Sequence, residues 1–407
     1  MTTVAGLPDV VALVNGTRAY AWGSPTVLPE LLGDEPTGEP VAELWIGAHP
    51  GQPSHVDAGE TRIGLDALVA ADPVGLLGPA VVDRFGARLP FLLKLLAAER
   101  ALSLQVHPDL AQAREGFARE NAAGVPVGAV HRNYQDDNHK PELLCALTPF
   151  EALCGFRAPA TSAAALAAFG VPELGPLLDV LHGATDLRAA VEYLLAVPEA
   201  SAPALVAAAA AGATRLLATA PDSPYAADAA LLVDLARQSP DETGPVVALL
   251  LNLVRLEPGE AVFLAAGQIH AYVRGFGVEL LANSDNVLRC GLTPKHVDGP
   301  ELLRVASFDP VPAAPWPSTP VAGGSRYPVP VDDFELSRLD LTPRSADLRS
   351  PGPQLLAATA GRVVVRGGDA EVTLDPGRAV FVPAGRPVTV AGPGTVFRAV
   401  VGPAVTG

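Results

Sequence analysis

The sequence predicts a mainly β protein with one inserted block of helices and two β-barrels. Short segments that alternate polar and apolar residues, as half-buried strands do, lie on both sides of residues 157–250. Within that range, Ala and Leu recur at helical spacing instead. A turn–strand–turn motif occurs twice, at 256–267 and 374–385, which indicates a repeated β unit. A chain of 407 residues exceeds one ordinary core, so we expect two or three domains.

The composition is that of a folded, acidic protein. Hydrophobic residues make up 49% and charged residues 18%, and the formal net charge is −16. Such a charge disfavours nucleic acid and anionic membranes as partners, so we expect neither. We find no signal-peptide pattern, and the most apolar run, 201–220, is Ala-dominated and contains Arg215, so we expect no membrane span. The three cysteines lack metal-binding spacing, which suits free thiols in a reducing cytoplasm.

The first hundred residues mix short apolar runs with Gly and Pro, which favours strands and a few helices. Trp22 and Trp45 lie beside polar residues, and each fits either a core position next to a turn or the wall of a pocket. The apolar segment 89–96 predicts a buried strand with one charge, Lys94, at its middle. Because an unpaired buried lysine is unfavourable, we expect Lys94 to be paired or functional.

Residues 101–109 predict a strand whose two faces differ. Ser103, Gln105 and His107 share one face, while the Leu and Val residues between them share the other. A solvent-facing strand would give the same alternation. The next residues, 109–124, predict a helix.

The repeated motif predicts two jelly-roll barrels of the cupin type, a fold that closes its sheets without long edges. Three residues after the final Gly, the first copy has His270 and the second has Val388, so only the first keeps a metal-ligand type. Between the copies, the Pro-rich segment 308–330 predicts a linker. The expected domains are a first barrel from residues 1–156 and 251–308, a helical insertion over 157–250, and a C-terminal barrel over 309–407 without metal ligands.

Three segments together offer the ligands of a metal site. Pro141 favours an extended backbone at Lys140, so the side chains of Lys140 and Glu142 should point the same way. One amide oxygen, one carboxylate and two imidazoles suit Zn²⁺, with Fe²⁺, Mn²⁺ and Co²⁺ left open. A divalent ion in this set leaves a net positive site that favours anionic oxygen. Each residue alone fits an ordinary structural role, but their combination predicts a metal site formed by Gln105, His107, Glu142 and His270.

A further polar set occurs in residues 277–295. Glu279 lies in an apolar strand, Arg289 comes after an Asn/Ser/Asp turn, and Lys295 comes after a proline. Glu279 and Arg289 either form an ion pair that fixes a loop, or act as an acid/base carboxylate and an anchoring cation. All three lysines of the chain, at 94, 140 and 295, lie in these motif-bearing segments.

Five motifs in this order resemble type I mannose-6-phosphate isomerase, and they lie at 89–94, 103–109, 138–143, 267–272 and 284–296. The resemblance covers essentially the whole chain. It implies a zinc-dependent enzyme on a cupin fold that interconverts mannose 6-phosphate and fructose 6-phosphate. The family's zinc ligands fall on the four residues of the predicted metal site, and its active-site arginine falls on Arg289. Its phosphate-side serine falls on Ser103, and its pocket lysines fall on Lys140 and Lys295.

This reaction moves a proton between C2 and C1 of an open-chain sugar through a cis-enediol. We expect Glu279 to be the base, because an apolar strand raises the pKa of a carboxyl group, with Lys140 as the rival. Lys94 and Trp22 are expected to line the substrate pocket. The partner would be a small sugar phosphate, and the protein a cytoplasmic monomer or weak homo-oligomer. One alternative is a non-catalytic sugar-sensing or metal-storing cupin, which the lysine–arginine set disfavours. The other is an iron dioxygenase, which Gln105 disfavours.

Overall fold

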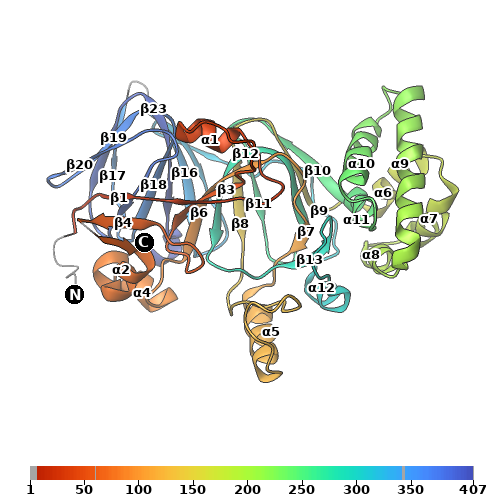
Figure 1. The fold of residues 1–407 in the computed structure, drawn as a ribbon, viewed down its shortest axis with the longest axis horizontal. Helices are drawn as coiled ribbons and strands as arrows, with labels where there is room; N and C mark the ends of the chain where they lie inside the picture. The colour runs from red at the N-terminus through yellow and green to blue at the C-terminus, as the bar shows by residue number, and fades with distance from the viewer. Residues whose placement is uncertain (1–6, 60, 342–343, 407) are drawn as a thin grey trace.

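The computed structural model describes residues 7–59, 61–341 and 344–406, and within them the strands form four sheets. Two bodies of β-structure lie side by side along the long axis of the molecule, and a group of helices lies at one end (Figure 1). The expectation of a mainly β protein with helices is confirmed.

The largest sheet has ten strands, and the long strand β12 (His270–Ala282) lies within it. β12 pairs first with β9 and then with β6 and β8, and the change occurs at Gly275, whose φ is +127°. A Cβ atom there would lie 2.6 Å from the Phe150 ring, so only glycine fits the crossing. The other strands are β2 (Gly16–Arg18), β3 (Glu43–Gly47), β6 (Phe91–Ala98), β7 (Leu104–Val106), β8 (Glu142–Ala146), β9 (Phe150–Phe156), β10 (Leu251–Leu256), β11 (Ala261–Leu264) and β13 (Leu288–Gly291).

The register of this sheet brings distant polar residues together. His270 on β12 and Arg289 on β13 both lie opposite Gln105 on β7. Glu279 on β12 lies opposite Lys94 on β6. These pairings join segments that are far apart in the sequence into one wall.

The helical group is inserted between β9 and β10, which pair with each other, so the chain leaves and re-enters the sheet at adjacent strands. By length and composition alone, the helical stretch Glu199–Thr219 could cross a membrane, and 33% of its most apolar window is buried. Its residues Val206, Ala209 and Ala213 pack into the largest apolar cluster. The elements are α6 (Pro159–Ala168), η1 (Pro172–Leu174), α7 (Gly175–Leu181), α8 (Arg188–Leu195), η2 (Glu199–Ser201), α9 (Ala202–Thr219), α10 (Ala226–Gln238), α11 (Gly244–Val247) and η3 (Ala248–Leu250).

The remaining helices are short, except the one predicted after the Ser103–His107 face. That helix begins with a capping box, in which Asp109 accepts from the Gln112 backbone and the Gln112 side chain accepts from the Asp109 backbone. These helices are α1 (Val27–Leu32), α2 (Leu65–Ala71), α3 (Pro73–Leu77), α4 (Pro79–Phe85), α5 (Leu110–Ala122), α12 (Gly299–Val305) and α13 (Pro403–Thr406).

Two further sheets form the second β body. A seven-stranded sheet has the order β1-β21-β18-β23-β16-β15-β14, and a four-stranded sheet has the order β17-β22-β19-β20. The N-terminal strand β1 thus pairs with a strand from near the C-terminus. The strands are β1 (Val11–Leu13), β14 (Thr319–Val321), β15 (Gly324–Tyr327), β16 (Glu335–Asp340), β17 (Ser345–Leu348), β18 (Gln354–Gly361), β19 (Val363–Gly367), β20 (Ala370–Leu374), β21 (Ala379–Val382), β22 (Val388–Ala391) and β23 (Gly394–Val400), and a small separate hairpin contains β4 (His55–Ala58) and β5 (Thr61–Gly64).

The two copies of the repeated motif form the same local structure. Gly259 and Gly377 occupy equivalent turns with φ of +91° and +80°, and each turn leads into a buried strand, β11 or β21. The segment 308–330 is not simply a linker, because β14 and β15 form a hairpin there and join the seven-stranded sheet. Ala322 and Gly323 make the turn of that hairpin and Gly324 begins β15, which the Pro-rich composition did not indicate.

Candidate metal centre and pocket

The largest sheet holds a cavity of about 430 Å³. All three lysines of the chain contribute to its wall, although they come from widely separated segments. The structure therefore brings together most of the residues singled out in the sequence, namely Trp22, Lys94, Ser103, Gln105, Lys140, Glu142, Glu279, Arg289 and Lys295.

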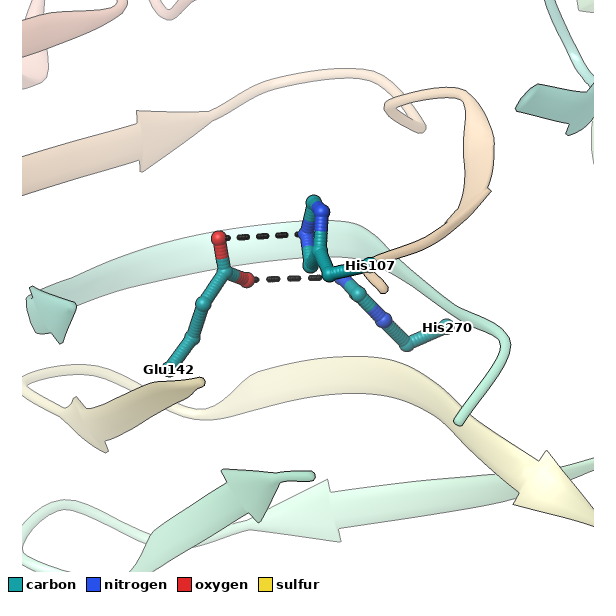
Figure 2. Close-up of side chains that lie close together, drawn as sticks. All are labelled: His107, Glu142 and His270. Atoms are coloured by element: carbon teal, nitrogen blue, oxygen red, sulfur yellow. Dashed lines mark ion pairs between the residues drawn. The ribbon is translucent and has the colours of Figure 1, made fainter. Parts of the chain in front are cut away.

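His107, Glu142 and His270 form a compact cluster beside this cavity, with their nearest ligand atoms all within 4.8 Å of one another. The Glu142 carboxylate faces both imidazoles, with Oε1 3.3 Å from His107 Nε2 and Oε2 3.3 Å from His270 Nε2 (Figure 2). All three side chains are at most 2% exposed. Of the four predicted ligands, three thus converge on one point.

Each imidazole is oriented by a backbone carbonyl. His107 Nδ1 lies 2.7 Å from the Asn286 carbonyl oxygen, and His270 Nδ1 lies 2.9 Å from that of Gln268. A proton on each Nδ1 is donated to the carbonyl, which leaves each Nε2 with a lone pair directed at the cluster. Burial lowers the pKa of His107 to about 4, so this imidazole is neutral at pH 7. A neutral imidazole is the form that binds a metal.

The cluster holds an ionised carboxylate. Burial opposes the ionisation of Glu142, but His107 and Lys140 together hold the pKa of the carboxyl group well below its usual range. Lys140 Nζ lies 3.4 Å from Glu142 Oε1. The sequence predicted that these two side chains point the same way, and they do.

Gln105 completes the set from β7. Its Nε2 lies 3.3 Å from His270 Nε2, and rotation of the terminal amide by half a turn would place the oxygen there. Gln105 therefore lies within reach of the same point as the other three ligands.

The donor atoms fit a divalent metal ion. Two of them, His107 Nε2 and Glu142 Oε2, are buried and have no hydrogen-bond partner within the described residues. Buried polar atoms are normally satisfied, so a cluster of unpartnered lone pairs needs an acceptor of electron density. Two imidazoles, a carboxylate and an amide are ligands that suit zinc and its divalent neighbours.

A buried charge network forms the wall next to the metal centre. Lys94 Nζ lies 3.1 Å from Glu279 Oε2 and 3.4 Å from Glu43 Oε1. Burial disfavours the charged form of Lys94, but Glu279 and Glu43 outweigh it and raise its pKa. Burial raises the pKa of the Glu279 carboxyl group, with Lys94 acting against it. Lys94 is therefore paired, as its position in an apolar strand required.

The ion pair considered between Glu279 and Arg289 is not among those of the described residues, because Glu279 pairs with Lys94 instead. The segment Arg289–Lys295, here called the cationic lip, borders the cavity. Burial lowers the pKa of Arg289, and burial together with Arg289 lowers that of Lys295. Within the described chain, no salt bridge reaches either cation. Unpaired cations beside a cavity suit an anionic ligand.

Sequence reasoning assigned no role to several polar residues of the cavity wall, among them Glu43, His49 and Asp285. Glu43 is buried and accepts a hydrogen bond from Trp45 Nε1 at 2.7 Å. His49 Nε2 lies 3.3 Å from Asp285 Oδ1, and both line the cavity. The sequence feature that could have identified them is their position next to residues already singled out. Glu43 and His49 lie on either side of Trp45, and Asp285 lies four residues before Arg289.

The fold and the site define a metal-binding protein with a His/Glu centre beside a cavity that two cations border. The family model described as phosphomannose isomerase type I, catalytic domain, matches residues 10–159. Mannose-6-phosphate isomerases of Salmonella typhimurium and Escherichia coli are each 39% identical, over 400 and 399 residues respectively, which covers 95% of this chain and 98% of each relative. The chain belongs to the type I phosphomannose isomerase family.

Solved structures of mannose 6-phosphate isomerases have the same fold as this chain. A zinc-bound mannose 6-phosphate isomerase superposes with a TM-score of 0.86 at 37% identity, over 97% of this chain and 100% of that one. The Salmonella typhimurium enzyme bound to fructose 6-phosphate and zinc gives the same values. The similarity therefore extends through both β bodies and the helical group.

Proposed function

We propose that this chain is a zinc-dependent aldose–ketose isomerase that interconverts D-mannose 6-phosphate and D-fructose 6-phosphate. The observation that carries the proposal is the placement of one buried His/Glu centre and two unpaired cations around a single cavity. A sugar phosphate has two ends that match these features, a carbonyl-bearing end for the metal and a dianion for the cationic lip.

We further propose that the two β bodies are cupin-type jelly-roll barrels. The first barrel would comprise residues 1–156 and 251–308, except that β1 (Val11–Leu13) joins the sheet of the second barrel. The helical insertion would comprise residues 157–250, and the second barrel residues 309–407. The repeated turn and strand support this division, and Val388 in place of His270 accounts for metal ligands in the first barrel alone.

Gln105, His107, Glu142 and His270 would hold the zinc ion. When bound, zinc would supply a Lewis acid that polarises the oxygens of the reacting carbons. The proton would move between C2 and C1 by way of a cis-enediol. Arg289, half-buried and unpaired, would stabilise the developing negative charge.

Glu279 is our candidate for the base that carries this proton. Its carboxyl group is buried in the cavity wall, and burial raises its pKa toward the working range. Lys140 is the rival, and its Nζ lies 3.4 Å from Oε1 of Glu142, one of the proposed ligands.

Ser103 and Lys295 would bind the phosphate group, while Trp22 and Lys94 would form the wall beside the sugar. Phosphate binding energy, gained far from C1 and C2, can be used to orient the reacting carbons. The partner is accordingly a small molecule, and the formal net charge of −16 disfavours nucleic acid and anionic membranes. Three buried free cysteines suit the cytoplasm.

The test is a coupled assay for fructose 6-phosphate formed from mannose 6-phosphate, run before chelation, after chelation and after zinc is added back. We expect activity that falls with the chelator and returns with zinc. A folded, zinc-replete sample without activity would sink the proposal. Equal activity in the chelated sample would remove zinc from it.

A further inference from the structure

Glu242, an acidic residue in the turn between α10 and α11, links the helical group to Leu292, which lines the cavity. Glu242 Oε1 accepts a hydrogen bond of 2.8 Å from the Leu292 backbone N–H, and Oε2 accepts one of 2.8 Å from that of Gly244. Among the described residues, no salt bridge involves Glu242. A carboxylate whose partners are two backbone amides fixes the backbone in place.

Leu292 has an unusual backbone that requires such support. Its φ is +55°, and it is the one residue other than glycine with positive φ in the described chain. A branched side chain strongly disfavours this region. Leu292 is 8% exposed and packs in the same apolar cluster as the helical group. Packing and the Glu242 hydrogen bond therefore hold a conformation that the residue would not adopt alone.

The backbones of the two segments also touch directly. A Cβ atom on Gly244 would lie 2.5 Å from the Leu292 nitrogen, and one on Gly291 would lie 2.7 Å from the Gly244 Cα. No side chain fits at either position. The start of α11 and the end of β13 are thus in van der Waals contact, and Glu242 spans the contact.

Leu292 begins the outer part of the cationic lip. Leu292, Thr293, Pro294 and Lys295 all line the cavity. The register of β13 against β7 shifts between Arg289 and Gly291, so the ladder alone does not determine where this segment points. Its direction depends on Leu292, and hence on Glu242.

We propose that Glu242 is a positioning residue for anion binding, through which the helical group orients the cationic lip. The inference rests on the proposed function, because it assigns Lys295 of the cationic lip to the phosphate group. It gives the helical insertion a role at the cavity, where its composition showed no chemistry.

The chain offers a matched control at another contact of the same helical group. Arg157 donates to Asp228 of α10 at 2.8 Å and to the Leu251 carbonyl at 2.8 Å. This contact anchors the helices to β10, and neither Arg157 nor Asp228 lines the cavity. Asp228→Asn should therefore loosen the insertion without moving the lip.

The experiment measures affinity for inorganic phosphate by calorimetry, since this probe reports on the lip without turnover. We expect Glu242→Ala to weaken phosphate binding roughly tenfold, the size expected for loss of a charge-assisted hydrogen bond. KM for mannose 6-phosphate should rise by a similar factor, with kcat within about threefold of the wild type. Glu242→Gln keeps one acceptor oxygen but directs an N–H group toward the second backbone amide. Its affinity for phosphate should therefore lie between those of the wild type and Glu242→Ala. Asp228→Asn should bind phosphate as the wild type does, with a lower Tm.

Wild-type phosphate affinity in folded Glu242→Ala protein would overturn the inference, and so would an equal loss in Asp228→Asn. If Glu242→Ala does not fold, wild-type phosphate affinity in Glu242→Gln would also overturn the inference. A wild-type protein that binds phosphate but does not convert the sugar would sink the proposed function and leave the role of Glu242 intact.

Discussion

Lys94 and Glu279 face each other across adjacent strands, with Lys94 Nζ 3.1 Å from Glu279 Oε2 and both side chains less than one tenth exposed. Glu43 lies on the other side of the ammonium at 3.4 Å. One cation thus neutralises part of the charge of two buried carboxylates. The stability of the cavity wall depends on this pairing of charges, because an uncompensated buried charge is strongly destabilising.

Lys94→Met should lower the free energy of unfolding by roughly 3 kcal/mol, because Glu43 and Glu279 both lose their buried cation. The measurement is urea unfolding at pH 7. Arg255→Met is the matched control, since it breaks a pair with Glu151 in which the arginine is 61% exposed, and it should cost under about 1 kcal/mol. Equal losses in the two variants would show that Lys94 does not stabilise the wall.

The assignment of the base can be decided by two substitutions. Glu279→Gln should reduce kcat by roughly 10² to 10⁴ with zinc content preserved, because the amide cannot accept the proton. Lys140→Ala should retain more turnover than Glu279→Gln. The measurement is steady-state kinetics alongside metal analysis. Near-wild-type turnover in Glu279→Gln, with none in zinc-loaded Lys140→Ala, would transfer the role to Lys140.

Local pattern was sufficient to predict the ligand face but not the charge network. Alternation along residues 101–109 placed Gln105 opposite the buried Leu104 and Val106, and both of those residues are indeed 0% exposed. The partner of Lys94 was not predictable, because it depends on the register between β6 and β12, and alternation does not specify which distant strand a segment pairs with. The ion pair considered for Glu279 and Arg289 failed for that reason.

In the helical insertion, too, the sequence predicted the secondary structure but not the tertiary contacts. Helical spacing predicted its secondary structure, and α6 to α11 agree with it. The contact of Glu242 with Leu292 joins two loops, where no periodicity exists to be read. A positive φ at a leucine is a property of the tertiary contact, so the sequence carries no local signal for it.

Removal of the metal should destabilise the fold as well as abolish activity. His107 Nε2 and Glu142 Oε2 have no hydrogen-bond partner among the described residues, and a bound metal would satisfy them until a chelator removed it. We expect the Tm to fall by several degrees with a chelator and to recover with zinc, since a ligand bound only by the native state stabilises it. His270→Ala should bind less zinc and show little response of Tm to the chelator. A full response in that variant would place the stabilising metal elsewhere.

Acid stability should depend on Glu301, which is 13% exposed and joins α12 to α5. Burial opposes its ionisation, but hydrogen bonds from Arg304, Tyr134 and Arg119 hold the pKa of Glu301 at about 2. Because the folded pKa lies below the unfolded value, this stabilisation is complete above pH 4.5 and is lost as the pH falls toward 2. After allowance for solvent screening we expect about 1 to 2 kcal/mol.

Glu301→Gln should remove that contribution, so that the variant is less stable than the wild type at pH 6 and nearly equal to it at pH 2. The measurement is the urea midpoint across this range. Glu115→Gln is the matched control, because Glu115 pairs with the same two arginines, each at 3.5 Å, but is 65% exposed. Exposed pairs contribute little, so its stability should match the wild type at every pH. If Glu301→Gln keeps the wild-type pH dependence, the acid-labile contact must lie at another carboxylate, because Glu301 would then bind no additional proton on unfolding between pH 4.5 and 2.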